Sequence, residues 1–344
     1  MMKTAILLLS LICASAARLR IVNVVVTYPP HHPMVRAAAH SWRHGYEAVV
    51  VTEAQTEGPL RSNFSRERWY GYPDDLRGKA AGVWKKGDAK LAAALRVANE
   101  SLSGEYDWLT YGDDDTYFLM HNVERLVEFM DSSVPFILSD TLNFCSEARC
   151  ARQYGRIKVC SLPGSPQPVD GCSMRPAADP VLGCTPKALS AQGACGPADT
   201  EAGWYGLPFP CGRNGALFSR GLLHTMTSSD WRTECELPNT LRGGGELRVY
   251  NCLRDRHVVT DPTSTGASWE SDTFCSFGFT HPAELLTVAE KTAQEPASCD
   301  ERCHRILFDT ISVSLDHVGG DTIEFQARLT DALHSARRSL LYST

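Results

Sequence analysis

The chain has 344 residues, of which 43% are hydrophobic and 22% are charged. This is the composition of an ordinary globular protein, and it supplies enough apolar side chains for a large core. The net charge of −6 at pH 7 gives no electrostatic reason to expect a nucleic acid as a partner. The length allows one large α/β domain or two smaller domains.

The N-terminal residues 1–17 have the three parts of a secretory signal peptide. Lys3 supplies a positive charge, Ala5 to Cys13 form an apolar stretch, and Ala14-Ser15-Ala16 offer a cleavage site of small residues. A membrane anchor is the alternative, but Arg18 ends the apolar run before the roughly 20 residues that a spanning helix needs. We therefore favour a cleaved signal, no stable transmembrane segment, and a protein of the ER or Golgi lumen or the extracellular space.

Cysteine usage agrees with the secretory pathway. Of 13 cysteines, 12 remain once Cys13 leaves with the signal, and an even number in this setting indicates disulfides. Zinc is a weaker interpretation of Cys299-x-x-x-Cys303-His304, because no second pair at zinc-module spacing accompanies it. Asn63-Phe64-Ser65 and Asn99-Glu100-Ser101 match the glycosylation sequon, which the same pathway would use.

The first elements in chain order predict the start of a parallel α/β sheet. Leu19–Thr27 and Ala48–Thr52 are β-branched apolar runs, typical of buried strands. Val35–His44 is Ala-rich and predicts a short helix between them. Tyr28–Met34 and Glu53–Gly58 are the loops that follow the two strands. Ligands of such sheets bind beyond the C-terminal strand ends, so these loops are candidate walls of a site.

The next elements alternate between polar stretches and periodic ones. Ser62–Gly87 is polar and aromatic with little periodicity, whereas Asp88–Leu102 has the apolar face of an amphipathic helix. Asn122 is placed to cap a helix over Val123–Met130, and Val134–Ser139 predicts another strand.

Three consecutive carboxylates, Asp113, Asp114 and Asp115, follow directly on the apolar run from Tyr106. Adjacent like charges repel, and a fold gains no stability from placing them at the end of a buried strand. A divalent cation is the usual compensation, and hard oxygen ligands suit Mg²⁺, Mn²⁺ or Ca²⁺. A solvated acidic turn is the alternative, but the aromatic residues on both sides place the carboxylates at the edge of a core.

The second half begins with a change of composition. Cys145–Cys211 is rich in Cys, Pro, Gly and Ala, which indicates either a disulfide-tied insertion that shapes a site or a surface insertion without function. Gly221–Thr227 predicts a short helix. Ser312–Val318 predicts a strand that ends in Asp316 and His317, and Asp321–Leu341 predicts a closing amphipathic helix.

Three segments carry a family resemblance. Trp84-Lys85-Lys86, Tyr106-Asp107-Trp108 and Asp113-Asp114-Asp115-Thr116-Tyr117 form the first, Tyr205–Ser219 the second and Glu246–Asp255 the third. Together they resemble the fringe-like and core-1 β1,3-galactosyltransferase-like glycosyltransferases, over about Leu19–His317. The resemblance implies a GT-A type α/β fold, Rossmann-like, with a mostly parallel central sheet flanked by helices. It implies one domain over 18–344, with 145–211 as the Cys-rich insertion.

The same resemblance implies roles for the carboxylates and the nucleotide site. Asp115 would ligate the metal, and Asp113 would support either the ribose of the nucleotide or the metal through water. Asp114 would shape the turn beside the nucleotide. Donor contacts from Thr27 and Arg36, or from His32 and Thr52, follow only from their places near the strand ends.

Two positions depart from the family pattern. Glu246 stands where the family carries the catalytic base, which is usually an Asp in an acidic pair, and here Gly245 precedes it. Asp316 and His317 stand where the family carries a metal-binding His, and either side chain suits Mn²⁺.

The resemblance implies a metal-dependent inverting transferase. It would move a hexose or N-acetylhexosamine from a UDP-sugar to a glycan or glycoprotein acceptor, through a β1,3 link. Glu246 would act as the general base. The alternative is a catalytically silent secretory relative, a chaperone or glycan-binding protein, although such a protein would have no need of three repelling carboxylates. A Ca²⁺-binding module is weaker still, because the run lacks the alternating oxygens and the Gly of a calcium loop.

Overall fold

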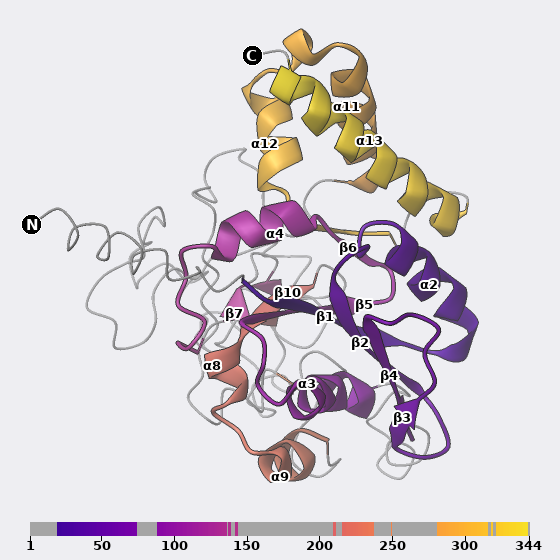
Figure 1. The fold of residues 1–344 in the computed structure, drawn as a ribbon, viewed down its shortest axis with the longest axis vertical. Coiled ribbons are helices and arrows are strands. Elements are labelled where there is room, and N and C mark those ends of the chain that lie inside the picture. Colours follow the sequence, from indigo (N-terminus) through magenta and orange to yellow (C-terminus); the bar gives the residue numbers. More distant parts are fainter. Residues whose placement is uncertain are drawn as a thin grey trace, which may run out of the picture.

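A central sheet organises the part of the chain that the computed structural model describes, which is residues 19–73, 88–135, 137–138, 142–143, 209–210, 215–236, 249, 281–315, 318 and 321–342. Seven strands of these residues form one mixed, mostly parallel sheet in the order β3-β4-β2-β1-β5-β10-β7, and helices flank it (Figure 1). The predicted α/β class with a mostly parallel sheet is therefore confirmed.

Four parallel strands make the centre of the sheet: β1 (Ile21–Thr27), β2 (Glu47–Glu53), β4 (Glu67–Tyr72) and β5 (Trp108–Asp113). Their apolar runs are continuous, as expected for strands that are covered on both faces. Antiparallel strands complete both edges, with β3 (Gly58–Leu60) on β4, β10 (Ala216–Ser219) on β5 and β7 (Ile137–Leu138) on β10. A separate pair joins β8 (Leu142–Asn143) to β9 (Phe209–Pro210).

Helices α2 (His32–His40) and α3 (Asp88–Leu102) cover opposite faces of the sheet. Successive side chains of a strand point to opposite faces, so Val24 packs in the core beneath α3 while Val25 packs against Val35 of α2. The bounds of α3 are those predicted from its apolar periodicity.

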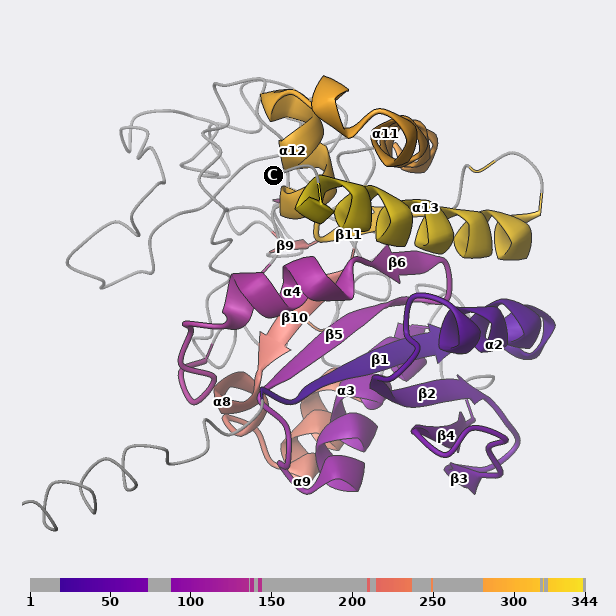
Figure 2. The same cartoon turned by 45° about the horizontal axis from the view of Figure 1, so that its top comes forward.

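The C-terminal helices form a second layer on one side of the sheet, together with α4 (Figures 1 and 2). The layer contains α4 (Met120–Val127), α11 (Pro282–Gln294), η5 (Pro296–Ser298), α12 (Glu301–Asp309) and α13 (Thr322–Tyr342). A short antiparallel pair, β6 (Thr116–Phe118) and β11 (Ser312–Ser314), lies between this layer and the sheet. The predicted closing helix is confirmed as α13. Cys299 and Cys303 are bonded to each other, which removes the zinc interpretation of that pair.

Several predicted elements were wrong in their bounds. The chain after β1 forms a 3-10 turn, η1 (Pro29–His31), and α2 then begins at His32 instead of Val35. Pro33 suits the first turn of a helix, because the amide that it lacks would have no partner there. Asn122 does not cap α4: it lies inside the helix, buried, and its amide donates to the carbonyls of Leu307 and Thr310 at 3.1 and 2.6 Å.

Several of the described elements were not predicted, among them β3, β4, α9 (Ser228–Asp230), η4 (Trp231–Glu236), α11 and α12. Strands β3 and β4 begin just before and within the stretch that seemed aperiodic, and β4 pairs along its whole length with β2. The short helix predicted over Gly221–Thr227 is present as α8 (Arg220–Leu223), and the chain continues as α9 and one π-helical turn, η4. The side chain of Thr227 accepts from the amide of Asp230 and forms a capping box, which explains where α9 starts.

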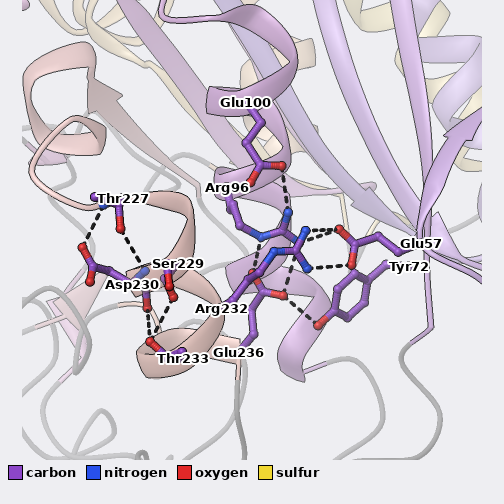
Figure 3. Close-up of polar contacts among 10 residues, drawn as sticks. All are labelled: Glu57, Tyr72, Arg96, Glu100, Thr227, Ser229, Asp230, Arg232, Thr233 and Glu236. Atoms are coloured by element: carbon purple, nitrogen blue, oxygen red, sulfur yellow. Dashed lines mark hydrogen bonds and ion pairs between the residues drawn. The ribbon is translucent and has the colours of Figure 1, made fainter.

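An ion-pair network fastens η4 to α3 (Figure 3). It contains two arginines, three glutamates and a tyrosine: Arg96, Arg232, Glu57, Glu100, Glu236 and Tyr72. The side chains of Arg96 and Glu236 are 1% and 3% exposed, and the hydroxyl of Tyr72 donates to Glu236 at 3.0 Å. Glu57 binds both arginines, so the loop after β2 is held against α3 and η4.

We expect the two arginines of this network to differ sharply in their contribution to stability. Arg96→Met leaves the buried carboxylate of Glu236 without its counter-charge, which should lower the free energy of unfolding by about 3–5 kcal/mol. Arg232→Met is the matched control, since its side chain is 47% exposed and such pairs contribute about 0–1 kcal/mol. Urea unfolding of the two variants measures the difference, and equal losses would contradict the assignment of Arg96 as the buried centre.

Candidate active site

The predicted site residues that the structure describes lie near the point where the order of the strands in the sheet reverses. From β1 the chain passes through α2 to β2 on one side, whereas β5, on the other side of β1, is reached through α3 on the opposite face. The C-terminal ends of β1 and β5 therefore flank a topological switch point, where α/β sheets bind their ligands. Val26 of β1 is paired with Asp113 of β5, so Thr27 lies level with the start of the carboxylate run.

A tight turn carries the three carboxylates. Asp113 ends β5, Asp114 and Asp115 form the turn, and β6 begins at Thr116; as whole residues, all three aspartates are partly buried. Gly112 permits this path, because a Cβ on it would lie 2.7 Å from the Cβ of Thr116. The glycine just before the acidic run is thus a steric requirement of the turn.

Asp114 reaches across the switch point to β1. The hydroxyl of Thr27 donates to Asp114 Oδ2 at 2.6 Å, and Nδ1 of His31 lies 3.0 Å from both carboxylate oxygens. The other ring nitrogen of His31 is 2.5 Å from the hydroxyl of Tyr28. The Asp114 side chain is only 8% exposed, and a carboxylate so buried needs such partners. Asp114 therefore shapes the turn by fastening it to the loop after β1.

Basic side chains lie beside the carboxylates. Lys90, in the first turn of α3, is 6% exposed and donates to the carbonyl of Thr27 at 2.7 Å. Nε2 of His32 lies 2.7 Å from the hydroxyl of Thr52, at the end of β2. Burial lowers the pKa of His32, and the charges of Arg36 and Lys90 add to this effect while Asp114 opposes it. The exposed Arg36 and the buried Lys90 thus act on the same imidazole.

The carboxylates also affect the pKa of Tyr28, which lies in the loop after β1. Partial burial raises the pKa of the Tyr28 hydroxyl, and the negative charges of Asp114 and Asp115 raise it further. Tyr28 is 41% exposed. The hydroxyl group of this exposed residue, which is hydrogen-bonded to His31, therefore stays protonated at neutral pH.

The residues on either side of Asp316 and His317, the predicted metal ligands near the C-terminus, are linked by backbone hydrogen bonds to the same turn. The amide of Leu315 donates to the carbonyl of Asp115 at 2.9 Å, and the amide of Val318 donates to the carbonyl of Leu315 at 3.2 Å. Asp316 and His317 themselves lie outside the described residues, as does Glu246. So do Trp84-Lys85-Lys86 and nearly all of the Cys-rich stretch 145–211.

Two absences apply only to the described ranges. Within them, no three His, Cys, Asp or Glu side chains are grouped as a ready cation site. No helix within them has the length and apolar character that crossing a bilayer would require.

Sequence reasoning missed His31 and Lys90. His31 was part of a loop named as a possible wall, but nothing local distinguished it from His32. Lys90 lies one turn before Ala94 and two turns before Val97, on the buried side of α3. A charged residue at the spacing of an apolar stripe could have indicated a buried lysine.

Comparison with known proteins does not assign the chain to a protein family. A scan against models of protein families finds no match, and a search of curated proteins finds none either. The function proposed below therefore depends on the geometry of the site and on the motifs of the sequence.

We expect Thr27→Val to test the bridge between the two strands. Valine keeps the shape of the side chain but removes the donor to Asp114, and a lost hydrogen bond to a charged group costs about 1.5–3 kcal/mol. Thr27→Ser keeps the hydroxyl and should retain most of that stability. Chemical unfolding compares the variants, and a serine variant as unstable as the valine variant would show that the methyl group, and not the hydrogen bond, matters.

Proposed function

We propose that the protein is a metal-dependent, inverting glycosyltransferase of GT-A type that uses a UDP-sugar. The observation that carries the proposal is the position of the carboxylate turn: Asp113, Asp114 and Asp115 lie at the C-terminal end of β5, beside the switch point of a mostly parallel sheet. A turn that only faced solvent would not need a carboxylate that is 8% exposed and bridged to the neighbouring strand.

The residues present fit a divalent cation. Asp113 and Asp115 offer hard oxygen donors two positions apart, and the carboxylate of Asp114 between them is bonded to Thr27 and His31. The bond between Leu315 and Asp115 brings the chain next to Asp316 and His317 to the same turn, which supports either of them as a further ligand. When bound, Mn²⁺ or another divalent cation supplies Lewis acidity toward the phosphates of the donor.

The side chains of this site divide the remaining work. Arg36 and Lys90 provide positive charge near the strand ends, which favours the diphosphate of a nucleotide. Asp113 would orient the ribose or hold a cation through water. Glu246 would take the proton of the acceptor hydroxyl as that oxygen attacks the anomeric carbon from the face opposite the diphosphate. Inversion then needs no nucleophile of the protein.

The acceptor would be a glycan or a glycoprotein and the product a β1,3 link. These two finer statements, and the location in the ER or Golgi lumen or outside the cell, depend on the resemblance to fringe-like enzymes and on the residues of the signal sequence. A screen of UDP-sugars for Mn²⁺-dependent hydrolysis by the purified protein tests the reaction class. If the protein neither hydrolyses a UDP-sugar nor binds UDP, the result favours the catalytically silent relative instead.

Asp115→Ala should abolish Mn²⁺-dependent binding of UDP. Partners outside the first coordination shell can already change metal affinity by about 10–100-fold, so loss of a direct ligand should cost at least as much. Asp131→Ala, at an exposed turn after α4, is the control and should bind as the wild type does. Calorimetric titration of UDP with and without Mn²⁺ makes the measurement. An unchanged metal-dependent affinity in Asp115→Ala would refute the metal assignment.

Glu246→Gln should separate binding from chemistry. The amide keeps the size of the side chain but cannot accept the proton, so transfer should fall by about 10²–10⁴-fold. UDP affinity should stay unchanged, because the base faces the acceptor and not the nucleotide. Transfer assays and UDP titration on the same preparation provide the two readouts, and a fully active variant would remove Glu246 from the role of base.

A further inference from the structure

One of the two glycosylation sequons lies on an exposed, well-formed turn. Asn63 and Ser65 are exposed in the connection from β3 to β4. The hydroxyl of Ser62 accepts from the amide of Phe64 at 3.0 Å and donates to its carbonyl at 3.1 Å. The ring of Phe64 packs edge-on against His40 of α2, with 5.0 Å between the ring centroids. The turn is thus anchored while the amide of Asn63 stays accessible.

The position of this turn keeps it away from the candidate active site. Strand β4 runs parallel to β1 and β5 through β2, and Asn63 comes just before β4 starts. It therefore lies at the N-terminal edge of the sheet, whereas the carboxylate turn lies at the C-terminal edge. Strand β3 is the outermost strand of that side, and its Leu60 is 41% exposed. A bulky polar group beside an edge strand hinders pairing with other chains.

The second sequon has a different environment. Asn99 is half-buried in the last turn of α3, and its Oδ1 accepts from the hydroxyl of Tyr106 at 2.8 Å. Tyr106 is itself 2% exposed and belongs to the core beneath α3. N-linked glycans occupy surface loops, and this asparagine is instead part of the packing between a helix and the strand that follows.

We infer that Asn63 carries an N-linked glycan and that Asn99 does not. In the modification, the amide nitrogen of Asn63 loses a proton and bonds to the anomeric carbon of an oligosaccharide. That carbon gives up its bond to a lipid diphosphate, which leaves with the bonding electrons. The inference depends on entry into the secretory pathway and not on glycosyltransferase activity, so the two proposals fail separately.

The test uses the full chain expressed in eukaryotic cells and recovered from the secretory pathway. Treatment with a peptide N-glycosidase, which hydrolyses the amide bond between asparagine and the glycan, should produce one step in gel mobility, and mass spectrometry should find Asn63 converted to Asp. Asn63→Gln and Ser65→Ala should both abolish the step. Ser65→Thr keeps the sequon and should retain it, and so should Ser101→Ala, which removes only the second sequon.

Two results would overturn the inference. One is a wild-type protein whose mobility the glycosidase does not change. The other is a step that survives in Asn63→Gln and disappears in Ser101→Ala. Ser65→Ala guards against a folding defect in the asparagine variant, since it leaves Asn63 in place. UDP titration of Asn63→Gln should match the wild type, because the turn is at the opposite edge of the sheet from the carboxylates.

Discussion

The candidate site depends on the bridge from Asp114 to Thr27 and His31. Strands β1 and β5 are paired only as far as Val26 and Asp113, so beyond that point side chains must hold the two chain segments together. A carboxylate taken out of water is costly unless donors replace its hydration, and both oxygens of Asp114 have such donors. The middle carboxylate thereby sets the turn that presents the other two.

The same turn is held from the C-terminal side of the molecule. Strand β11 pairs with β6, and the bond from Leu315 to Asp115 continues that pairing into the carboxylate turn. Strand β11 in turn belongs to the core that α11, α12 and α13 form. The turn is therefore a junction between the parallel sheet and the C-terminal helices, and a shift in either part would move the carboxylates relative to the strand ends.

How far the sequence predicts this arrangement depends on whether the signal is local. Strands β1, β2 and β5 and helix α3 were predicted from apolar runs and periodicity, and the site from three adjacent like charges. Strand β4 was not, because its sequence, Glu-Arg-Trp-Tyr-Gly-Tyr, has no clear period of its own, and its pairing partners β2 and β3 are needed to define it as a strand. The cap predicted at Asn122 failed for the same reason: its partners, Leu307 in α12 and Thr310 just after that helix, lie far along the chain.

The charges around the carboxylate turn differ from those of an acidic turn that is only solvated. Surface carboxylates in a turn need no counter-ions from the protein, because water screens them. Here the ammonium group of the buried Lys90 donates to the carbonyl of Thr27, whose hydroxyl donates to Asp114, and the charges of Lys90 and Arg36 both act on the imidazole of His32. Burying an ammonium group costs free energy that packing alone does not return. Opposite charges near the same strand ends would suit the ligand of the proposed function, a diphosphate bound with a divalent cation.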